Sequence, residues 1–568
     1  MPTVQRGVRA FGATALTSVA LVVVWVALTL PNRLDEMSPA AFLRLPVELL
    51  VLVAVVLVLP ERLRRLRGAV VVLAGLAAAV VTAFKLLDIG FGQALNRPFD
   101  PLIDWSYTGE MVETVRGSAP GGLGIALLVV AGLALVATLL LVPLAVLRVG
   151  RVALRRRAAA TVAVGVLLPV WLVLSVTGVG AGVGGRTVPV ASGAAASYAY
   201  AQVARIPAEL RDQRDFARAA AADPQRDTPS ADLLTGLRGK DVLVVFVESY
   251  GRAALDDPGL SPGIVETLDA GTRRLTDDGY AARSGWLTSP TFGAISWLAH
   301  ATLQSGLWVD SQQRYDHLVT TDRETLTSLF GRAGWRTVAS VPANTRDWPQ
   351  GAFCGYDHVY DSRNVGDRGP RFGYPTMPDQ FTLDAFQHAE LAPRDRPRVM
   401  AEIDLISSHA PWSRTPDLIP QDEVGDGSVY DGMPETLPSE ADIWPDRERV
   451  RAAYAHSIRY SLESVVSFLS TYADDDLVVV LLGDHQPATI VSGGVSGNDP
   501  GHDVPVTVIA QDPAVIAAIG PQGSDWGWDA GLRPSHDAPV WRMDAFRDEL
   551  LTAFGPKGET VTARAGAR

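Results

Sequence analysis

Long apolar stretches and short apolar runs divide the chain into two parts. Long stretches fill the first third, at 11–30, 44–60, 69–87, 122–147 and 158–180. A bilayer core about 30 Å thick is crossed by roughly 20 apolar residues in a helix. Five such stretches in series argue against buried core helices. They predict a polytopic α-helical membrane region of about five transmembrane helices at residues 1–181, although the second stretch is short and contains Pro46.

Charges between these stretches predict the orientation of the membrane region. The N-terminus carries Arg6 and Arg9, and the loops "ERLRRLRG" and "RVGRVALRRR" are basic, whereas 88–121 is rich in Asp and Glu. Lys and Arg are enriched in cytoplasmic loops. We therefore expect a multi-pass protein of the cell (plasma) membrane, with its N-terminus in the cytoplasm and everything after about residue 181 outside. The first stretch reads as an anchor, because it is too long for a signal peptide and lacks a cleavage pattern.

The pattern of residues 182–568 predicts a linker followed by one α/β domain. Residues 182–235 predict a juxtamembrane linker with a helix that Pro207 interrupts, and 236–568 predict an extracytoplasmic domain. Helical patterns at 323–334 and 447–473 separate short β-rich runs, which is typical of a mostly parallel central sheet covered by helices. The expected strands are 241–249, 335–344, 397–408, 476–484 and 504–512.

Polar side chains follow four of these strands. They are Glu248, then Arg346 with Trp348, then His409, and finally the pair Asp484 and His485. Open parallel sheets bind ligands beyond the carboxyl ends of their strands. The four strand ends together predict one convergent polar site.

The acid and imidazole groups suggest a metal site. Glu248 directly follows a buried run, where a charge is costly unless it is paired or bound to metal; as alternatives it caps a helix or pairs with Arg252. Asp484 and His485 combine a carboxylate oxygen with an imidazole, a set that suits Zn²⁺ or Mn²⁺. The alternative for "GDH" is an ordinary turn at the end of a strand.

A hydroxyl near this site is a candidate nucleophile. Ser296 begins a predicted helix that Gly306 ends, and a helix N-terminus favours anions. A metal-activated hydroxyl there would attack a phosphoryl or sulfuryl centre. The alternative is a simple helix N-cap, and Ser289 and Thr291 are rival hydroxyls in the same loop.

Other polar residues have both a functional and an ordinary interpretation. His409 would act as a general acid or a phosphate contact, or be an incidental loop histidine. Arg346 would clamp an anion through its guanidinium, or lie solvated in a loop. The side chains of Trp348 and Trp412 would line the cleft or simply pack, and His502 is a weaker candidate ligand.

Composition excludes some functions. The net charge of −12 argues against a nucleic-acid partner, which needs clustered Lys and Arg. The single cysteine, Cys354, excludes an intramolecular disulfide.

The order of these motifs resembles the alkaline phosphatase and sulfatase superfamily: a strand ending in Glu248, a hydroxyl at a helix start, a strand leading to His409, then "GDH". With several spans before the domain, the chain is similar to the lipoteichoic acid synthase and phosphoglycerol transferase branch. Members of that branch move glycerol phosphate from a phospholipid head group. The detailed resemblance covers about residues 240–510.

The resemblance implies a role for each matching residue. Glu248, Ser296, Asp484 and His485 would bind one divalent metal ion, Mn²⁺ in the first place, with Zn²⁺ and Mg²⁺ as alternatives. Ser296 would be the nucleophile that forms a covalent phosphoryl intermediate. His409, Arg346 and Trp348 would contact the substrate. The partners implied are a phospholipid donor and an envelope glycan or lipid acceptor.

Departures from the family pattern leave other functions open. The synthases use threonine where this chain has Ser296, and the sulfatase motif requires Pro and Arg where Leu298 and His300 stand. Gln486 and Pro487 after "GDH" also differ from the commoner pattern. The alternatives are a sulfatase-like, phosphatase or phosphodiesterase hydrolase, with water as the acceptor, and a non-catalytic envelope scaffold.

Overall fold

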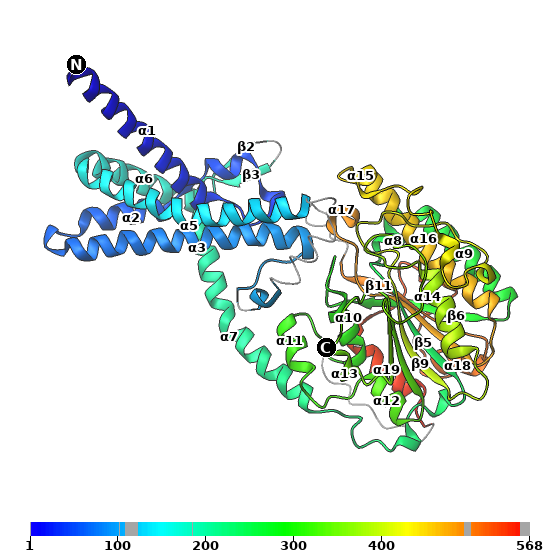
Figure 1. Ribbon diagram of the computed structural model, residues 1–568. Coiled ribbons are helices and arrows are strands. Elements are labelled where there is room, and N and C mark those ends of the chain that lie inside the picture. Colours follow the sequence, from blue (N-terminus) through cyan, green and yellow to red (C-terminus); the bar gives the residue numbers. More distant parts are fainter. Residues whose placement is uncertain (1, 102, 108–122, 184–185, 494–500, 557–568) are drawn as a thin grey trace. The chain divides into compact units, whose positions relative to one another are not determined.

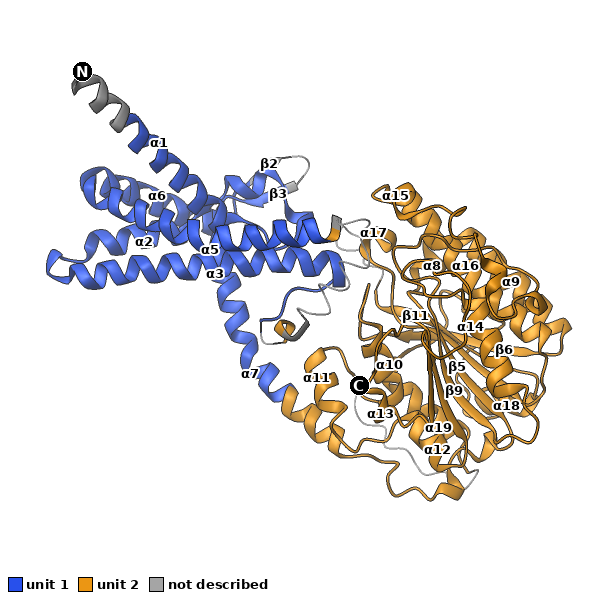
Figure 2. Ribbon diagram, in the orientation of Figure 1, with its two compact units in different colours: residues 1–102, 125–212 blue, residues 103–124, 213–568 orange. Residues whose placement is uncertain are grey.

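The computed structural model (Figure 1) describes residues 2–101, 103–107, 123–183, 186–493 and 501–556. The chain forms two compact units, coloured separately in Figure 2. Unit 1 comprises residues 1–102 and 125–212, and unit 2 comprises 103–124 and 213–568. The boundary near residue 212 lies within the predicted linker.

Unit 1 is a bundle of apolar helices. Each of the five predicted stretches contains one, in the order α1 (Pro2–Thr29), α2 (Val47–Val58), α3 (Arg64–Leu95), α5 (Leu123–Arg155) and α6 (Arg157–Thr177). Among the described residues, four of these helices are long and apolar enough to cross a membrane. The exception is α2, whose 12 residues extend only about 18 Å at 1.5 Å per residue. It is shorter than predicted because Pro46 forms its N-cap in an extended conformation.

Short strands surround the ends of these helices. Next to α2, β1 (Leu45–Pro46) pairs in parallel with β4 (Ala191–Ser192), and β2 (Gly180–Val183) pairs with β3 (Arg186–Pro189). The predicted juxtamembrane helix is α7 (Ala194–Ala221). It continues through Pro207 where the sequence predicts a break. Pro207 is exposed, so water or head groups can satisfy the carbonyl that lacks its amide partner.

Unit 2 contains a mostly parallel nine-stranded sheet. Eight strands follow the order β12 (Asp529–Ala530), β6 (Ala281–Thr288), β11 (Asp503–Ala510), β10 (Leu477–Gly483), β5 (Asp241–Val247), β9 (Val399–Leu405), β7 (Arg336–Val341) and β8 (His358–Asp361). The ninth, β13 (Val540–Arg542), pairs with β6. Strands β10, β5, β9, β7 and β8 are parallel, and β11 is antiparallel to both of its neighbours. The predicted fold class is confirmed, and the five predicted strands are β5, β7, β9, β10 and β11.

Helices cover both faces of the sheet, as Figure 1 shows. Alternate residues of β5 belong to two apolar cores, one on each face of the sheet. Leu243 and Val245 pack in one core, and Val244 and Phe246 pack in the other. The helices of unit 2 are α8 (Ala253–Asp256), α9 (Ser261–Asp277), α10 (Ser296–Ser305), α11 (Gln312–Leu318), α12 (Leu326–Arg332), α13 (Gly351–Cys354), α14 (Asp379–Phe386), α15 (Glu440–Ile443), α16 (Arg447–Thr471), α17 (Thr489–Ser492), α18 (Pro513–Ile519) and α19 (Phe546–Ala553). With both faces covered, the carboxyl-end edge of the parallel strands is where polar groups gather.

Candidate active site

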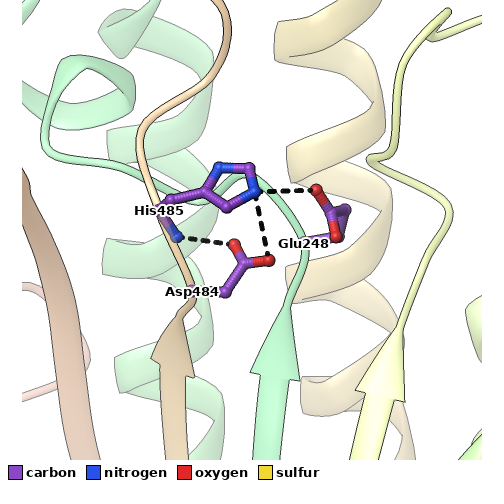
Figure 3. Close-up of side chains that lie close together, drawn as sticks. All are labelled: Glu248, Asp484 and His485. Carbon is purple, nitrogen blue, oxygen red and sulfur yellow. Dashed lines mark hydrogen bonds and ion pairs between the residues drawn. The ribbon is translucent and has the colours of Figure 1, made fainter. Parts of the chain in front are cut away.

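Two adjacent parallel strands bring the predicted metal ligands together. In the β5–β10 register Val247 pairs with Gly483, so the next residues, Glu248 and Asp484, leave the sheet side by side. Figure 3 shows one ring nitrogen of His485 directed at both carboxylates. One ligand atom from each of the three residues lies within 4.8 Å of the others.

Local hydrogen bonds orient this cluster. The backbone amides of Ser249 and His485 both donate to Asp484 Oδ1, each at 2.7 Å, which leaves Oδ2 facing His485. The Nδ1–H of His485 donates to the Gln486 carbonyl at 2.8 Å. His485 Nε2 therefore points at the carboxylates, 3.5 Å from Glu248 Oε1 and 3.5 Å from Asp484 Oδ2. A fixed tautomer of this kind is common for metal-binding histidines.

Ser296 places its hydroxyl within the cluster. Its Oγ donates to Glu248 Oε2 at 2.9 Å and lies 3.2 Å from His485 Nε2. It is the first residue of α10, whose N-cap is Ile295 in the left-handed region at φ 71°, so the Ser296 side chain does not cap the helix. The rival hydroxyls are engaged elsewhere: Ser289 donates to the Asp484 carbonyl and Thr291 to that of Ala294, each at 2.6 Å.

The two carboxylates differ in electrostatic environment. Burial raises the pKa of Glu248, but the imidazoles of His409 and His485 and the hydrogen bond from Ser249 outweigh it, and the pKa falls to about 2. For Asp484, burial and the adjacent Glu248 charge raise the pKa to about 6. Two acids held this close favour a bound cation.

The donor set fits a divalent metal ion. It offers two carboxylates, one imidazole nitrogen and one hydroxyl oxygen, a mixture that suits Mn²⁺ and Zn²⁺. Within the described ranges, His485 is the ion-pair partner of both Glu248 and Asp484. The alternative pairing of Glu248 with Arg252 is not formed, because Arg252 contacts Asp256 at 2.8 Å and Asp503 at 3.2 Å.

His409 lies in the loop after β9 and acts electrostatically on Glu248. The Nδ1–H donates to the Ala410 carbonyl at 2.5 Å, and the ring stacks on Tyr374 with centroids 3.7 Å apart. Ser408, beside it, donates to the Glu248 carbonyl at 2.6 Å and ties the loop to the end of β5. The structure thus brings His409 to the predicted site.

The remaining predicted residues differ in exposure and packing. Arg346 is exposed, and Trp348 packs near Tyr356, with ring centroids 6.2 Å apart. Trp412 is 2 % exposed and stacks on Trp444 in the core, which is the packing alternative. His502 packs against Phe292, in the loop before Ser296, with ring centroids 5.6 Å apart.

A second acid–histidine cluster was not predicted. It consists of His300 on α10 and of Glu402 and Asp404 on β9, with ligand atoms within 4.8 Å. His300 Nδ1 lies 2.8 Å from Glu402 Oε1 and 3.7 Å from Asp404, and its ring stacks on Phe246. The available signal was two acids two residues apart in an apolar strand, which places both on one face.

Burial and charge couple this second cluster to the first. Burial lowers the pKa of His300, but Asp404 and Glu402 outweigh it and raise the pKa to about 9. Burial and the charges of Glu402, Asp484 and Glu248 raise the pKa of Asp404 to about 7, against the opposing effect of His300. A protonated His300, one helical turn after Ser296, would offset part of the negative charge around the Ser296 hydroxyl.

Comparison with known proteins adds a family match. Residues 240–514 match the sulfatase family model. No curated protein sequence matches the chain.

Similar solved structures cover about three fifths of the chain. The lipoteichoic acid synthase LtaP from Listeria monocytogenes is 15 % identical over 60 % of this chain and 78 % of its own, with a TM-score of 0.36. The periplasmic domain of EcEptC from Escherichia coli is 14 % identical over 60 % and 90 %, with a TM-score of 0.38. The Streptococcus pyogenes phosphoglycerol transferase GacH, in complex with sn-glycerol-1-phosphate, is 12 % identical over 62 % and 82 %, with a TM-score of 0.36.

Proposed function

We propose that the chain, whose residues 240–514 match the sulfatase family model as the sequence resemblance predicted, is a membrane-anchored, metal-dependent phospho-group transferase. It would take a phosphoglycerol- or phosphoethanolamine-type group from a phospholipid head group and transfer it to an envelope glycan or lipid. The catalytic domain would lie outside the cell membrane. The apolar helices of unit 1 support this proposal, because they would keep the enzyme beside a lipid donor.

One observation carries the proposal. The Ser296 hydroxyl lies within hydrogen-bond distance of both Glu248 and His485, so the proposed nucleophile lies beside the proposed metal ligands. A serine used only as a helix cap would bond to a backbone amide of its own helix. Nucleophilic catalysis requires a hydroxyl held next to the groups that activate it.

Glu248, Ser296, Asp484 and His485 would hold the metal ion. When bound, the ion supplies Lewis-acid chemistry, lowering the pKa of the serine hydroxyl and neutralising phosphoryl charge. Mn²⁺ is the ion we favour, with Zn²⁺ or Mg²⁺ as alternatives, because two carboxylates and one imidazole suit a hard or borderline cation.

The reaction would proceed in two displacements at phosphorus. Ser296 Oγ forms a bond to phosphorus, the bond from phosphorus to the diacylglycerol oxygen breaks, and that oxygen takes up a proton. The phosphoalcohol remains on Ser296 until an acceptor hydroxyl attacks the same phosphorus and Ser296 regains its proton. His409, whose Nδ1–H is fixed on Ala410, would contact the phosphoryl group or carry a proton with Nε2. Arg346 and Trp348 would contact the substrate.

The residues that follow Ser296 give less support to a sulfatase, in which the nucleophile is chemically modified and hydrolyses a sulfate ester. The sulfatase motif places Pro two residues and Arg four residues after the nucleophile. Here Leu298 and His300 occupy those positions, and His300 is committed to Glu402 and Asp404.

The test uses the full chain in proteoliposomes containing phosphatidylglycerol labelled in its head-group glycerol. Without an acceptor, we expect mass spectrometry to find the phosphoglycerol adduct on Ser296, and Ser296→Ala to lose both adduct and turnover. Thr291→Ala is the matched control in the same loop and should keep the adduct. An adduct on another residue, or undiminished turnover in Ser296→Ala, would refute the nucleophile. Release of free glycerol phosphate in the presence of glycan or lipid acceptors would show a hydrolase instead.

A further inference from the structure

One face of α7 exposes large apolar side chains. Tyr200, Val203, Ile206 and Leu210 are 76 %, 66 %, 37 % and 46 % exposed. Their spacing of three, three and four residues places them on one side of the helix. An apolar face of this kind on an otherwise charged helix requires a partner.

The first turns of α7 are anchored to three helices of unit 1. Glu48 of α2 accepts a hydrogen bond from the Ala196 amide at 2.9 Å. Lys85 of α3 lies 5.8 Å from the centre of the Tyr198 ring. Trp171 of α6 donates to the carbonyl of Ser192, two residues before α7 begins, at 3.1 Å.

These contacts place the start of α7 at the depth of the membrane-spanning helices. Trp171 lies six residues before the end of α6 at Thr177, which is about 9 Å along the helix axis. None of the residues of α6 is buried in the described structure, as expected for a helix that faces lipid. The exposed face of α7 therefore continues a lipid-facing surface. Trp171, Tyr198 and Tyr200 are also the residue types that favour the membrane interface.

The direction of α7 fits the plane of the interface. In Figure 1, its part within unit 1 leaves the bundle at a steep angle to α3 and α5 instead of continuing along them. Arg205 and Arg211 on this part are exposed to solvent. Arginines beside an apolar face are typical of helices that lie on anionic lipid surfaces.

We propose that residues 198–212 of α7 form an interfacial helix in the outer leaflet of an anionic phospholipid bilayer. Tyr200, Val203, Ile206 and Leu210 rest on the acyl chains, and Arg205 and Arg211 contact the lipid phosphates. The chain that enters unit 2 is thereby held at the lipid surface. The inference depends on unit 1 alone and stands whether or not the proposed transfer reaction occurs.

The test compares two positions on opposite faces of α7. Val203→Cys and Ala201→Cys, each in a Cys354→Ala background, are labelled with an environment-sensitive fluorophore in the full chain. Both positions are exposed, and two residues correspond to about 200° around a helix. The proteins are reconstituted into phosphatidylglycerol-containing vesicles with a quencher attached either to the acyl chains or dissolved in water.

We expect acyl-chain quenching at position 203 to exceed that at 201 at least threefold, and the aqueous quencher to show the reverse order. Arg205→Gln with Arg211→Gln should reduce acyl-chain quenching at 203 in anionic vesicles and leave it unchanged in zwitterionic ones. Equal quenching at both positions would overturn the proposal. Shielding at 203 that disappears on dilution of the protein among lipids would also overturn it, because a second copy would then cover this face.

Discussion

At the scale of single residues, the proposed metal site has ligands that would contribute unequally to metal binding. Glu248 and Asp484 supply carboxylates from two rigid strand ends, whereas Ser296 adds one neutral oxygen from a helix start. A charged ligand contributes far more to the affinity for a divalent ion than a hydroxyl does. Substitution of a carboxylate should therefore weaken metal binding, whereas substitution of Ser296 should abolish turnover and leave most of the metal affinity.

The first prediction concerns metal content. Since losing an outer partner of a metal ligand typically costs about 10–100-fold in affinity, Glu248→Gln and Asp484→Asn should lose at least that much. Ser296→Ala should retain the metal, because both carboxylates and His485 remain. Elemental analysis of the purified full chain measures the bound ion, with the exposed Asp537→Asn as control. Unchanged metal content in Asp484→Asn would contradict the assigned site.

A second prediction concerns Asp379, whose side chain is fully buried between Ser407 and Ser461. Burial raises its pKa to about 6, from an ordinary value of 3.8, against the hydrogen bonds that lower it. The folded state therefore holds this proton more tightly than the unfolded chain. Its contribution to stability is present below pH 4 and is lost as the pH rises to about 6, a change of about 3 kcal/mol.

Asn at position 379 does not titrate. Its Oδ1 can still accept from the Ser407 amide, and its Nδ2–H can donate to the Ser461 hydroxyl, which reverses that hydrogen bond. In thermal unfolding of the full chain in detergent, the melting temperature of Asp379→Asn relative to that of the original protein should rise between pH 4 and 6. Above pH 7 the difference between the two melting temperatures should be constant. Parallel profiles across this range would mean that the carboxyl group has an ordinary pKa in the folded protein.

At the scale of elements, buried runs were the most predictable part of the fold. Every residue of the seven-residue strands β5 and β10 is buried, and all of them except Asp241 are apolar, so the polar residue that follows each strand was evident. The start of α10 was also predicted at Ser296, but the N-cap interpretation of that serine differs from the structure. Ile295 occupies the cap, which frees the hydroxyl for Glu248.

Elements defined by long-range contacts were less predictable. Strand β6 carries polar residues such as Arg283 and Ser284 and is fixed by pairing with β11, β12 and β13. The second cluster joins α10 to β9 across about 100 residues of sequence, and a pattern within one segment contains no information about such a contact. The loop position of His409 likewise depends on Ser408 and Tyr374.

A third prediction tests what holds the central strand. Asp241 begins β5, and its carboxylate accepts two bonds from Arg396, at 2.7 and 2.8 Å, one from Arg398 and one from the Val399 amide. Its side chain is 1 % exposed, so Asp241→Ala leaves the buried Val399 amide and two partly exposed guanidinium groups without their acceptor. The expected loss of unfolding free energy is about 3–5 kcal/mol.

Asp476 provides the matched control for this experiment. It pairs with Lys240 and Arg398 near the same end of the sheet, but its side chain is 36 % exposed. Asp476→Ala should cost about 0–1 kcal/mol, as is usual for a pair near the surface. Equal losses of melting temperature in the two variants would show that burial does not determine the strength of these pairs.

At the scale of the whole molecule, the side on which the catalytic domain lies depends on α2. Without α2, four helices would cross the membrane and return the chain to its starting side. The two ends of α2 show that it runs beside most of its neighbour α6. Arg157 at the start of α6 donates to the carbonyl of Leu57, near the end of α2, at 2.6 Å. At the other end, Pro46 pairs with Ser192, whose carbonyl accepts a hydrogen bond from Trp171 in the second half of α6.

These contacts lead to the final prediction, that the chain crosses the membrane five times and that residue 231 lies outside. The extended residues of β1 lengthen the short α2, and arginines follow it at the end that we assign to the cytoplasm. The measurement is labelling by a membrane-impermeant thiol reagent in intact cells that produce the full chain with Cys354→Ala. Ala231→Cys should react in intact cells, whereas Glu61→Cys and Arg156→Cys should react only after lysis, since all three positions are exposed. Reaction of Glu61→Cys in intact cells would place the end of α2 outside, and the five-crossing topology would then be wrong.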